Sequence, residues 1–207
     1  MAPATRETAR LRLHPWGEEH TELLIRLSSM PDVMRFIGPG LPWPRAKAEE
    51  VAAAQRQHWS EHGFGWRPAT AKTAGDLVGF MALNFLGDGT AGLDASEYEI
   101  GWWLAPEAWG RRLAREGAQA MCDEAFDDLK APSVVARMQP ANARSIAVAK
   151  ATGLTHDFRT TGKTGEPLVV YRLAAANRSI ASTGARGCDR HQKRLDFPAD
   201  GGEGCRG

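Results

Sequence analysis

The sequence lacks the features that mark a membrane, secreted or metal-binding protein. No stretch approaches the roughly 18 or more apolar residues that cross a bilayer, and residues 1–13 lack the apolar core of a signal peptide. There are only three cysteines, Cys122, Cys188 and Cys205, at spacings that match no zinc or disulfide framework. We therefore expect a cytoplasmic protein with reduced thiols and no membrane partner.

An excess of charge of one sign is also missing. The 26 Lys and Arg residues nearly cancel the 25 Asp and Glu residues, and the net charge is +1 at pH 7. Without an overall positive field, no specific nucleic-acid partner is predicted. The 207 residues, 43% hydrophobic and 25% charged, fit one folded domain with a short appendage.

The appendage begins where large apolar residues become rare. Residues 174–207 contain six glycines and six Lys or Arg residues. Such a segment buries too little surface to offset the entropy lost on ordering. The sequence therefore predicts a folded domain at residues 1–173 and a disordered, Gly/Arg-rich tail at residues 174–207.

Periodicity and helix breakers divide the domain into strands and helices. Helical spacing or helix-forming composition predicts helices at residues 18–28, 45–62, 111–129 and 142–151. Alternation, or β-branched and aromatic runs, predicts strands at residues 10–14, 65–72, 76–86, 96–104, 133–138 and 168–173, with one further strand near the C-terminal end. The order is typical of an α+β protein whose mixed sheet carries helices on both faces.

The stretch from Glu99 to Glu116, EIGWWLAPEAWGRRLARE, is the most informative. A strand runs into a tight loop, and the predicted helix begins with Arg111, Arg112 and Arg115. Cations at a helix N-terminus oppose the dipole by about 0.3–1 kcal/mol each, so three of them favour an anionic partner. Free N–H groups converge on the same place, which predicts a phosphate or pyrophosphate site. An exposed basic first turn is the alternative.

Two other patterns carry less information. Asn142 is a good helix N-cap and Ser145 lies one turn further on, but alone both are ordinary capping residues. His58 and His62 fit the H-x-x-E-H zinc pattern, yet no third ligand is evident. We expect no metal site.

Taken together, the motifs resemble the GCN5-related N-acetyltransferase (GNAT) superfamily, in the RimJ/RimL-like branch that modifies ribosomal-protein N-termini and various small amines. The resemblance covers residues 8 to 173. Its ordered motifs are T-x-R-L-x-L-x-P-W at 8–16, PDVMRFIG at 31–38, H-W-x-E-H-G-F-G at 58–65, G-x-L-V-G-F at 75–80, E-I-G-W-W-L-A-P-E-x-W-G at 99–110 and N-x-x-S-x-x-V at 142–148. It implies a twisted, mostly antiparallel mixed sheet of about seven strands, in which two central strands splay apart.

The resemblance also implies acetyl-CoA as cosubstrate, in the gap between the splayed strands. The backbone at Trp102, Trp103 and Leu104 would pair with the pantetheine arm, while Asn142 and Ser145 would reach it near the thioester. The pyrophosphate would be wrapped by the loop residues Trp109, Gly110, Arg111, Arg112, Leu113, Ala114 and Arg115. Phe36, Trp43 and Trp102 are predicted to line the pocket of the acceptor amine.

Arg112 departs from the family pattern, which usually has glycine at this position of the loop. Glycine lets the backbone approach phosphate closely, and a side chain is tolerated where φ is negative. Because φ is negative in a first helical turn, we expect Arg112 to fit, with its guanidinium directed outward or onto a phosphate.

Acetyl transfer needs a neutral amine and a proton for the leaving thiolate. Glu97 and Glu99 are the only carboxylates on the central strand, and alternation puts both on one face. We predict Glu99 as general base, acting directly or through a water, with Glu97 as its substitute or as a cation-binding group. Ser145 is the predicted proton donor. Solvated carboxylates without a catalytic role are the alternative for both glutamates.

The expected function is transfer of an acetyl group from acetyl-CoA directly to a primary amine, which is a protein N-terminal α-amine or a small-molecule amine. The alternative is a catalytically weak or inactive CoA-binding module that acts as a sensor or partner protein. The sequence leaves the acceptor, the acyl-chain preference and the choice between monomer and homodimer open.

Overall fold

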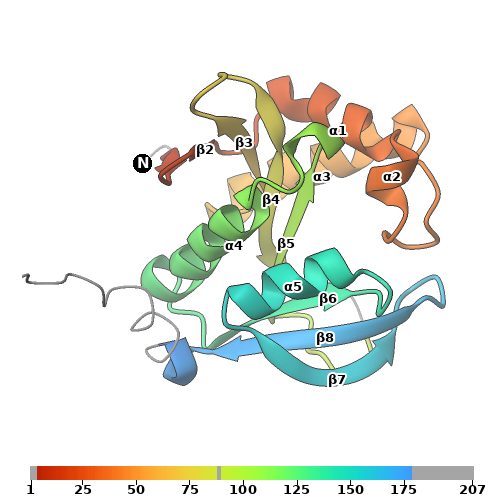
Figure 1. Ribbon diagram of the computed structural model, residues 1–207, viewed down its shortest axis with the longest axis vertical. Coiled ribbons are helices and arrows are strands. Elements are labelled where there is room, and N and C mark those ends of the chain that lie inside the picture. The colour runs from red at the N-terminus through yellow and green to blue at the C-terminus, as the bar shows by residue number, and fades with distance from the viewer. Residues whose placement is uncertain (1–3, 88–89, 179–207) are drawn as a thin grey trace, which may run out of the picture.

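A computed structural model describes residues 4–87 and 90–178. Within them, one sheet of eight strands has the order β1-β2-β3-β4-β5-β6-β8-β7 (Figure 1). The strands are β1 (Arg6–Glu7), β2 (Leu11–Leu13), β3 (Arg67–Ala71), β4 (Leu77–Phe85), β5 (Tyr98–Leu104), β6 (Ser133–Met138), β7 (Thr155–Thr161) and β8 (Pro167–Ala174). The sequence predicted about seven strands; β1 has two residues, too few for a periodic signal.

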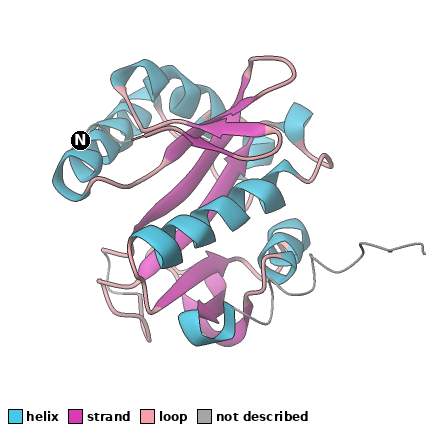
Figure 2. Ribbon diagram, turned by 90° about the vertical axis from the view of Figure 1, so that its left-hand side faces the viewer, coloured by secondary structure: helices cyan, strands magenta, loops and turns pink. Residues whose placement is uncertain are grey.

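The helices lie on both faces of this sheet, as predicted (Figure 2). They are α1 (Thr21–Ser28), preceded by η1 (Glu18–His20), α2 (Pro31–Met34), α3 (Arg45–His62), α4 (Leu113–Asp123) and α5 (Ala143–Ala151). Helix α4 continues into a π-helical turn, η3 (Glu124–Asp128), and short 3₁₀ turns stand at η2 (Pro106–Ala108) and η4 (Ala175–Asn177).

Two apolar cores hold the layers together. On one face, α4 packs on the sheet through buried residues such as Met121 and Ile100. On the other face, Leu24 of α1 and Trp59 of α3 share a core with Phe80, together with Trp16, which precedes η1. The sheet is thus buried on both sides along β4 and β5, which fixes their register and holds the ends of these strands in place.

Strands β5 and β6 part soon after they meet. All other neighbouring strands are antiparallel, but β5 and β6 are parallel and pair only at Tyr98 with Val134 and at Glu99 with Val135. Beyond these pairs β5 continues to Leu104, hydrogen-bonded to β4 on its other edge. Figure 1 shows β6, β7, β8 and α5 as a separate lower part of the molecule. The splay that the resemblance implies is therefore present.

The folded part continues beyond the predicted boundary at residue 173. Strand β8 ends at Ala174, η4 follows, and the guanidinium of Arg178 pairs with Asp123 and Asp127. The remainder of the predicted tail lies outside the described residues.

No helix among the described residues is long and apolar enough to cross a membrane.

Candidate functional site

The loop between β5 and α4 has two residues with left-handed backbone, separated by Arg111. Gly110 has φ 73° and Arg112 has φ 61°. The expectation of a negative φ at Arg112 is wrong, because α4 begins at Leu113 and Arg112 is its N-cap rather than part of its first turn. A non-glycine residue in this conformation costs about 1–2 kcal/mol. The chain carries that strain at the position where the family usually has glycine.

The same loop has a series of N–H groups without an acceptor among residues 4–87 and 90–178. Across the described residues, none of the backbone N–H groups from Gly110 to Arg115 has a hydrogen-bond acceptor, and the first one used is that of Glu116, which donates to Arg112 O. The side chains of Arg111, Arg112 and Arg115 are exposed beside them. Unpaired N–H groups at the positive end of a helix form an anion site, so these residues fit a pyrophosphate.

The open edge of β5 lies next to this loop. An added Cβ on Gly79 of β4 would lie 2.0 Å from Trp103 O, so the Trp103 carbonyl faces β4. Because the backbone direction alternates along a strand, the N–H and C=O of Trp102 face the open edge. The Leu104 carbonyl accepts a hydrogen bond from Trp109 Nε1 (2.8 Å). Trp102 therefore keeps its predicted backbone position, and Trp103 is turned away from the gap.

The N-terminus of α5 faces this edge from the opposite side of the splay. Asn142 Oδ1 accepts from the Ser145 N–H (3.1 Å), the cap that the sequence predicted. Ser145 Oγ accepts from Trp102 Nε1 (3.3 Å), and the Arg144 guanidinium lies 5.2 Å from the centroid of the Trp109 ring. These contacts bring the two sequence motifs together, one on each side of the gap.

The two predicted carboxylates lie on the other face of β5, and each is bound to an arginine. Glu99 Oε1 and Oε2 accept from Arg137 Nε (2.7 Å) and Nη2 (3.0 Å). Glu97 pairs with Arg172, which also donates to Asp157 Oδ2 (2.6 Å). The Glu99 and Glu97 side chains are 19% and 20% exposed, so neither is the solvated carboxylate of the alternative interpretation.

The aromatic residues predicted for the acceptor pocket are divided between the two faces. Trp43, which precedes α3, lies with its ring centroid 5.5 Å from that of Trp103. The prediction that Trp102 joins Trp43 is wrong, because Trp102 packs into the α4 core on the opposite face. Phe36 is half-buried, and the Arg35 guanidinium lies 5.2 Å from its ring centroid. Trp103, rather than Trp102, lies on the same face as Trp43.

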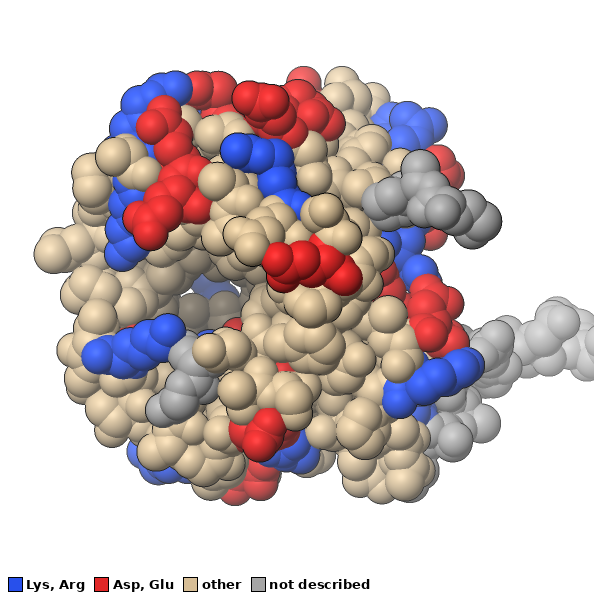
Figure 3. Space-filling view, turned by 180° about the vertical axis from the view of Figure 1, so that it is seen from behind, with Lys and Arg blue, Asp and Glu red and all other residues tan. Residues whose placement is uncertain are grey.

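Sequence reasoning missed two polar residues, Arg137 of β6 and Gln139 directly after that strand. Arg137 holds Glu99 and also donates to Thr90 Oγ1. Gln139 Nε2 donates to Gly38 O (2.9 Å) and so ties the loop between α2 and α3 to β6. An arginine in the otherwise apolar strand SVVARM was the one available signal. Figure 3 shows the molecule hollowed between its upper and lower parts, with both signs of charge intermixed on that face.

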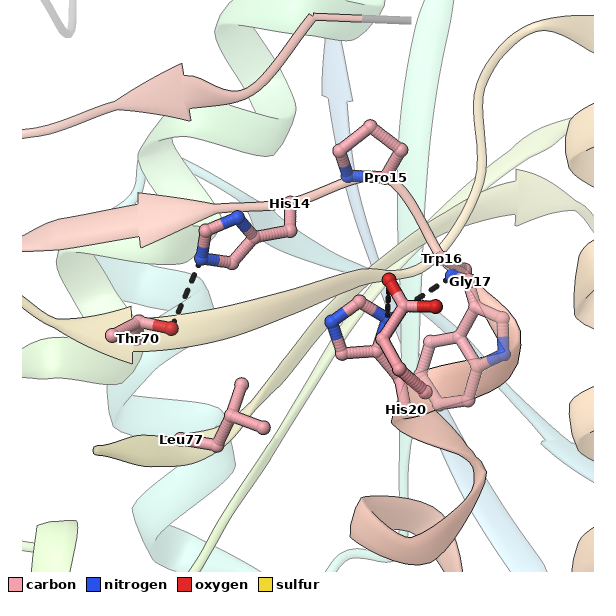
Figure 4. A pocket seen from close by; sticks show the side chains of 8 residues that line it. His14, Pro15, Trp16, Gly17, His20, Thr70 and Leu77 are labelled. Carbon is pink, nitrogen blue, oxygen red and sulfur yellow. Dashed lines mark hydrogen bonds and ion pairs between the residues drawn. The ribbon is translucent and has the colours of Figure 1, made fainter. Parts of the chain in front are cut away.

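A separate pocket of about 360 Å³ lies at the far end of the sheet, by His14, Trp16 and His20 (Figure 4). His14 Nε2 lies 3.0 Å from Thr70 Oγ1, and His20 Nδ1 accepts from the Gly17 N–H (3.0 Å). Burial lowers the pKa of both imidazoles, which are therefore neutral at pH 7. None of the predicted site residues lines this pocket.

The H-x-x-E-H histidines form part of an aromatic cluster. The His58 and His62 ring centroids are 4.6 Å apart, and both rings pack on Phe64 and Phe85. In the portion of the chain that the structure describes, no group of three potential ligands could hold a metal ion.

Comparison with known proteins agrees with this geometry. Residues 10–155 match the model of the acetyltransferase (GNAT) domain family. The "FsC-acetyl coenzyme A-N(2)-transacetylase" of Aspergillus fumigatus is 32% identical over 158 residues, 75% of this chain; the match spans 66% of that protein, just under two thirds of its length. The Bacillus subtilis protein YkkB is 30% identical over 176 residues, 82% of this chain and 95% of that one.

Among solved structures, an acetyltransferase from Agrobacterium tumefaciens superimposes with a TM-score of 0.69 at 28% identity. The match covers 82% of this chain and 94% of that one. The chain therefore belongs to the GNAT acetyltransferases, an enzyme family that takes its acetyl group from acetyl-CoA.

Proposed function

We propose that this protein transfers the acetyl group of acetyl-CoA directly to a primary amine, a protein N-terminal α-amine or a small-molecule amine. The observation that carries the proposal is the run of unpaired N–H groups from Gly110 to Arg115 beside the open edge of β5. A phosphate-bearing ligand with an extended arm satisfies both features, because its phosphates accept from the loop and its amides pair with the strand edge.

In this proposal the residues from Trp109 to Arg115 hold the pyrophosphate, and the backbone of Trp102 pairs with the pantetheine arm. The positive φ of Arg112 supports this placement, since two left-handed residues turn successive N–H groups toward one point. Asn142 reaches the arm through its amide group, because only its Oδ1 is used by the cap of α5. When bound, acetyl-CoA supplies the activated acyl group.

Ser145 is the proposed proton donor to the departing thiolate. The indole N–H of Trp102 donates to Ser145 Oγ, so the serine hydroxyl proton is available for a different acceptor. A thiol with a pKa near 8.5 leaves readily at pH 7, so we assign this residue a modest contribution. Trp102 thus acts twice, through its backbone on the arm and through its indole on Ser145.

Glu99 is the proposed base for the amine, and Arg137 holds its carboxylate in position. Each of its oxygens accepts one hydrogen bond from Arg137 and retains lone-pair capacity for the amine or for a bridging water. Glu97 pairs with Arg172 and neutralises its charge, so we assign it no contact with the amine. An α-amine costs about 3.4 kcal/mol less to deprotonate than a lysine amine, so it is the easier acceptor.

The acceptor is placed on the side of Trp43 and Trp103, near the hollow visible in Figure 3. The name of the Aspergillus relative, an N(2)-transacetylase, supports a nitrogen as the acceptor atom. Two indoles and paired charges favour an acceptor that is recognised by shape and apolar contact.

A thiol-release assay with acetyl-CoA tests the proposal. The panel contains peptides with free N-termini, polyamines, aminoglycosides and small α-amino compounds, with calorimetry of acetyl-CoA binding in parallel. We expect binding and release that at least one α-amine accelerates well above the amine-free rate. Binding without release over the panel would instead support the CoA-binding module, and absence of binding would overturn both.

A further inference from the structure

The N-terminal segment is tied to the start of α4 by a compact set of hydrogen bonds. Glu116 Oε1 accepts from Thr8 Oγ1 (2.5 Å) and from the Arg10 N–H (2.7 Å), while its Oε2 accepts from Arg10 Nε (2.7 Å). Arg10 Nη1 donates in addition to the carbonyl of Arg111 (2.8 Å). One arginine therefore binds both the first turn of the helix and the loop before it.

The carboxylate at the centre of these contacts is mostly shielded from solvent. The Glu116 side chain is 17% exposed, whereas that of Arg10 is 47% exposed. Burial alone would raise the pKa of Glu116, but the hydrogen bonds from Thr8 and Arg10 outweigh it and hold that pKa below its usual value. Glu116 is thus charged at neutral pH, and it holds Arg10 in the orientation that reaches Arg111.

The position of the Arg111 carbonyl affects the backbone conformation of the whole loop. It lies between Gly110 and Arg112, the two residues with positive φ that direct the unpaired N–H groups. A strained conformation persists only where surrounding contacts over-determine it. Among the described residues, the hydrogen bond from Arg10 is the one that fixes the Arg111 carbonyl from outside the loop.

We propose that Arg10 and Glu116 are positioning residues for the phosphates of acetyl-CoA. Thr8 and Glu116 orient Arg10, and Arg10 fixes the Arg111 carbonyl, so that the N–H groups of the loop converge on the pyrophosphate. This inference rests on the proposed placement of the phosphates and gives a function to the T-x-R motif at the beginning of the domain. Neither residue contacts the reacting atoms.

The test compares Arg10→Ala with Arg12→Ala. Arg12 lies two residues further along the chain, in β2, is 51% exposed and pairs with Glu7, so it offers a matched loss of one surface arginine. We expect the Kd for CoA, measured by calorimetry, to rise about fivefold in Arg10→Ala, the factor that one typical net hydrogen bond contributes. In Arg12→Ala it should stay within about 1.5-fold of wild type, since a surface ion pair contributes little.

A second substrate separates positioning from general loss of structure. S-acetylpantetheine carries the thioester and the arm but no pyrophosphate. In Arg10→Ala and in Glu116→Gln, kcat/KM should fall about fivefold with acetyl-CoA and stay at the wild-type value with S-acetylpantetheine. Thermal unfolding of each variant confirms that it is folded.

Three results would overturn the inference. These are an unchanged Kd for CoA in both Arg10→Ala and Glu116→Gln, equal losses with the two thioesters, or an equal loss in Arg12→Ala. Failure of the proposed function gives a different result, because wild-type protein would then bind no CoA, or would bind it and release no thiol from either thioester.

Discussion

The two sides of the β5 strand differ in how their polar groups are satisfied. On the side of α4 and α5, the described loop offers N–H groups without acceptors and a strained Arg112. On the side of Trp43, Glu99 and Glu97 are each bound to an arginine. A surface with unmet hydrogen bonds identifies the kind of ligand it takes, whereas a surface whose charges pair internally does not. This is why the donor is clear here and the acceptor is not.

The largest expected effect is a fall in kcat on substitution of Glu99, on the proposed acceptor side. Glu99→Gln removes the proposed base but keeps an oxygen and an amide beside Arg137. We expect kcat to fall about 10²–10³-fold between pH 6 and 9, with little change in the KM for acetyl-CoA. Glu61→Gln, an exposed carboxylate on α3, is the control and should leave kcat unchanged. Full turnover of Glu99→Gln over this pH range would rule out Glu99 as the base.

A smaller effect is expected at the gap between the two sides. Ser145→Ala should lower kcat about tenfold at pH 7, and Trp102→Phe, which loses the indole N–H to Ser145 together with part of the ring, about threefold. The loss in Ser145→Ala should shrink above about pH 8.5, where the thiolate leaves without a proton. Steady-state pH profiles of both variants measure this, and a loss that does not depend on pH would argue against proton donation.

The strained loop gives a third comparison, with an internal control. Arg112 and Lys130 are the non-glycine residues with positive φ, 61° and 56°, in the described part of the chain. Substitution of either by glycine should raise the free energy of unfolding by about 0.5–1 kcal/mol, because the relieved strain exceeds the added entropy of the unfolded chain. Denaturant unfolding measures this gain.

Only Arg112→Gly should also alter CoA binding, with a Kd about threefold higher through the lost guanidinium. Lys130→Gly lies away from the loop and should bind CoA as wild type does. Equal binding by both variants would show that the Arg112 side chain does not contact the phosphates.

The smallest expected effect concerns pH. The folded-state pKa of Glu116 is lowered from 4.5. Its charged form therefore stabilises the hydrogen bonds with Thr8 and Arg10 above pH 4.5, and this stabilisation is lost as the pH falls through the lowered pKa. The contribution of Glu116 to CoA affinity should be constant from pH 8 to about 5 and should be lost only as the pH falls below 4.5. Arg10→Ala should lack this additional loss. Calorimetry, with circular dichroism to verify folding, tests it.

Much of the fold was predictable because its elements have strong local signals. Helix α3, from Arg45 to His62, and strand β6, from Ser133 to Met138, have the predicted bounds. Strand β7, THDFRTT, had no predicted bounds, since its polar sequence shows no alternation and a register irregularity interrupts it between His156 and Arg159. Helix α4 begins two residues later than predicted, because arginine gives no sign of a left-handed conformation.

The local structure of the proposed CoA side was partly predictable. Asn142 caps α5 through Ser145 as its sequence indicated, whereas the conformation of Arg112 was not foreseen. The assignment of Trp102 and Trp103 to opposite faces required knowledge of which helices cover which face, since both residues are aromatic. The pairing of Glu99 with Arg137 joins residues 38 positions apart across parallel strands, and no local pattern encodes such a contact.

The brief pairing of β5 with β6 has a mechanical consequence. Two residue pairs, Tyr98 with Val134 and Glu99 with Val135, are the whole of the ladder that joins the five strands on one side to the three on the other. So short a ladder can act as a hinge between the two groups of strands, and the Glu99–Arg137 ion pair also connects β5 to β6 at this point. A ligand that lies along both strands beyond the hinge would stiffen it, so filling the gap and fixing the angle between the two halves become one event.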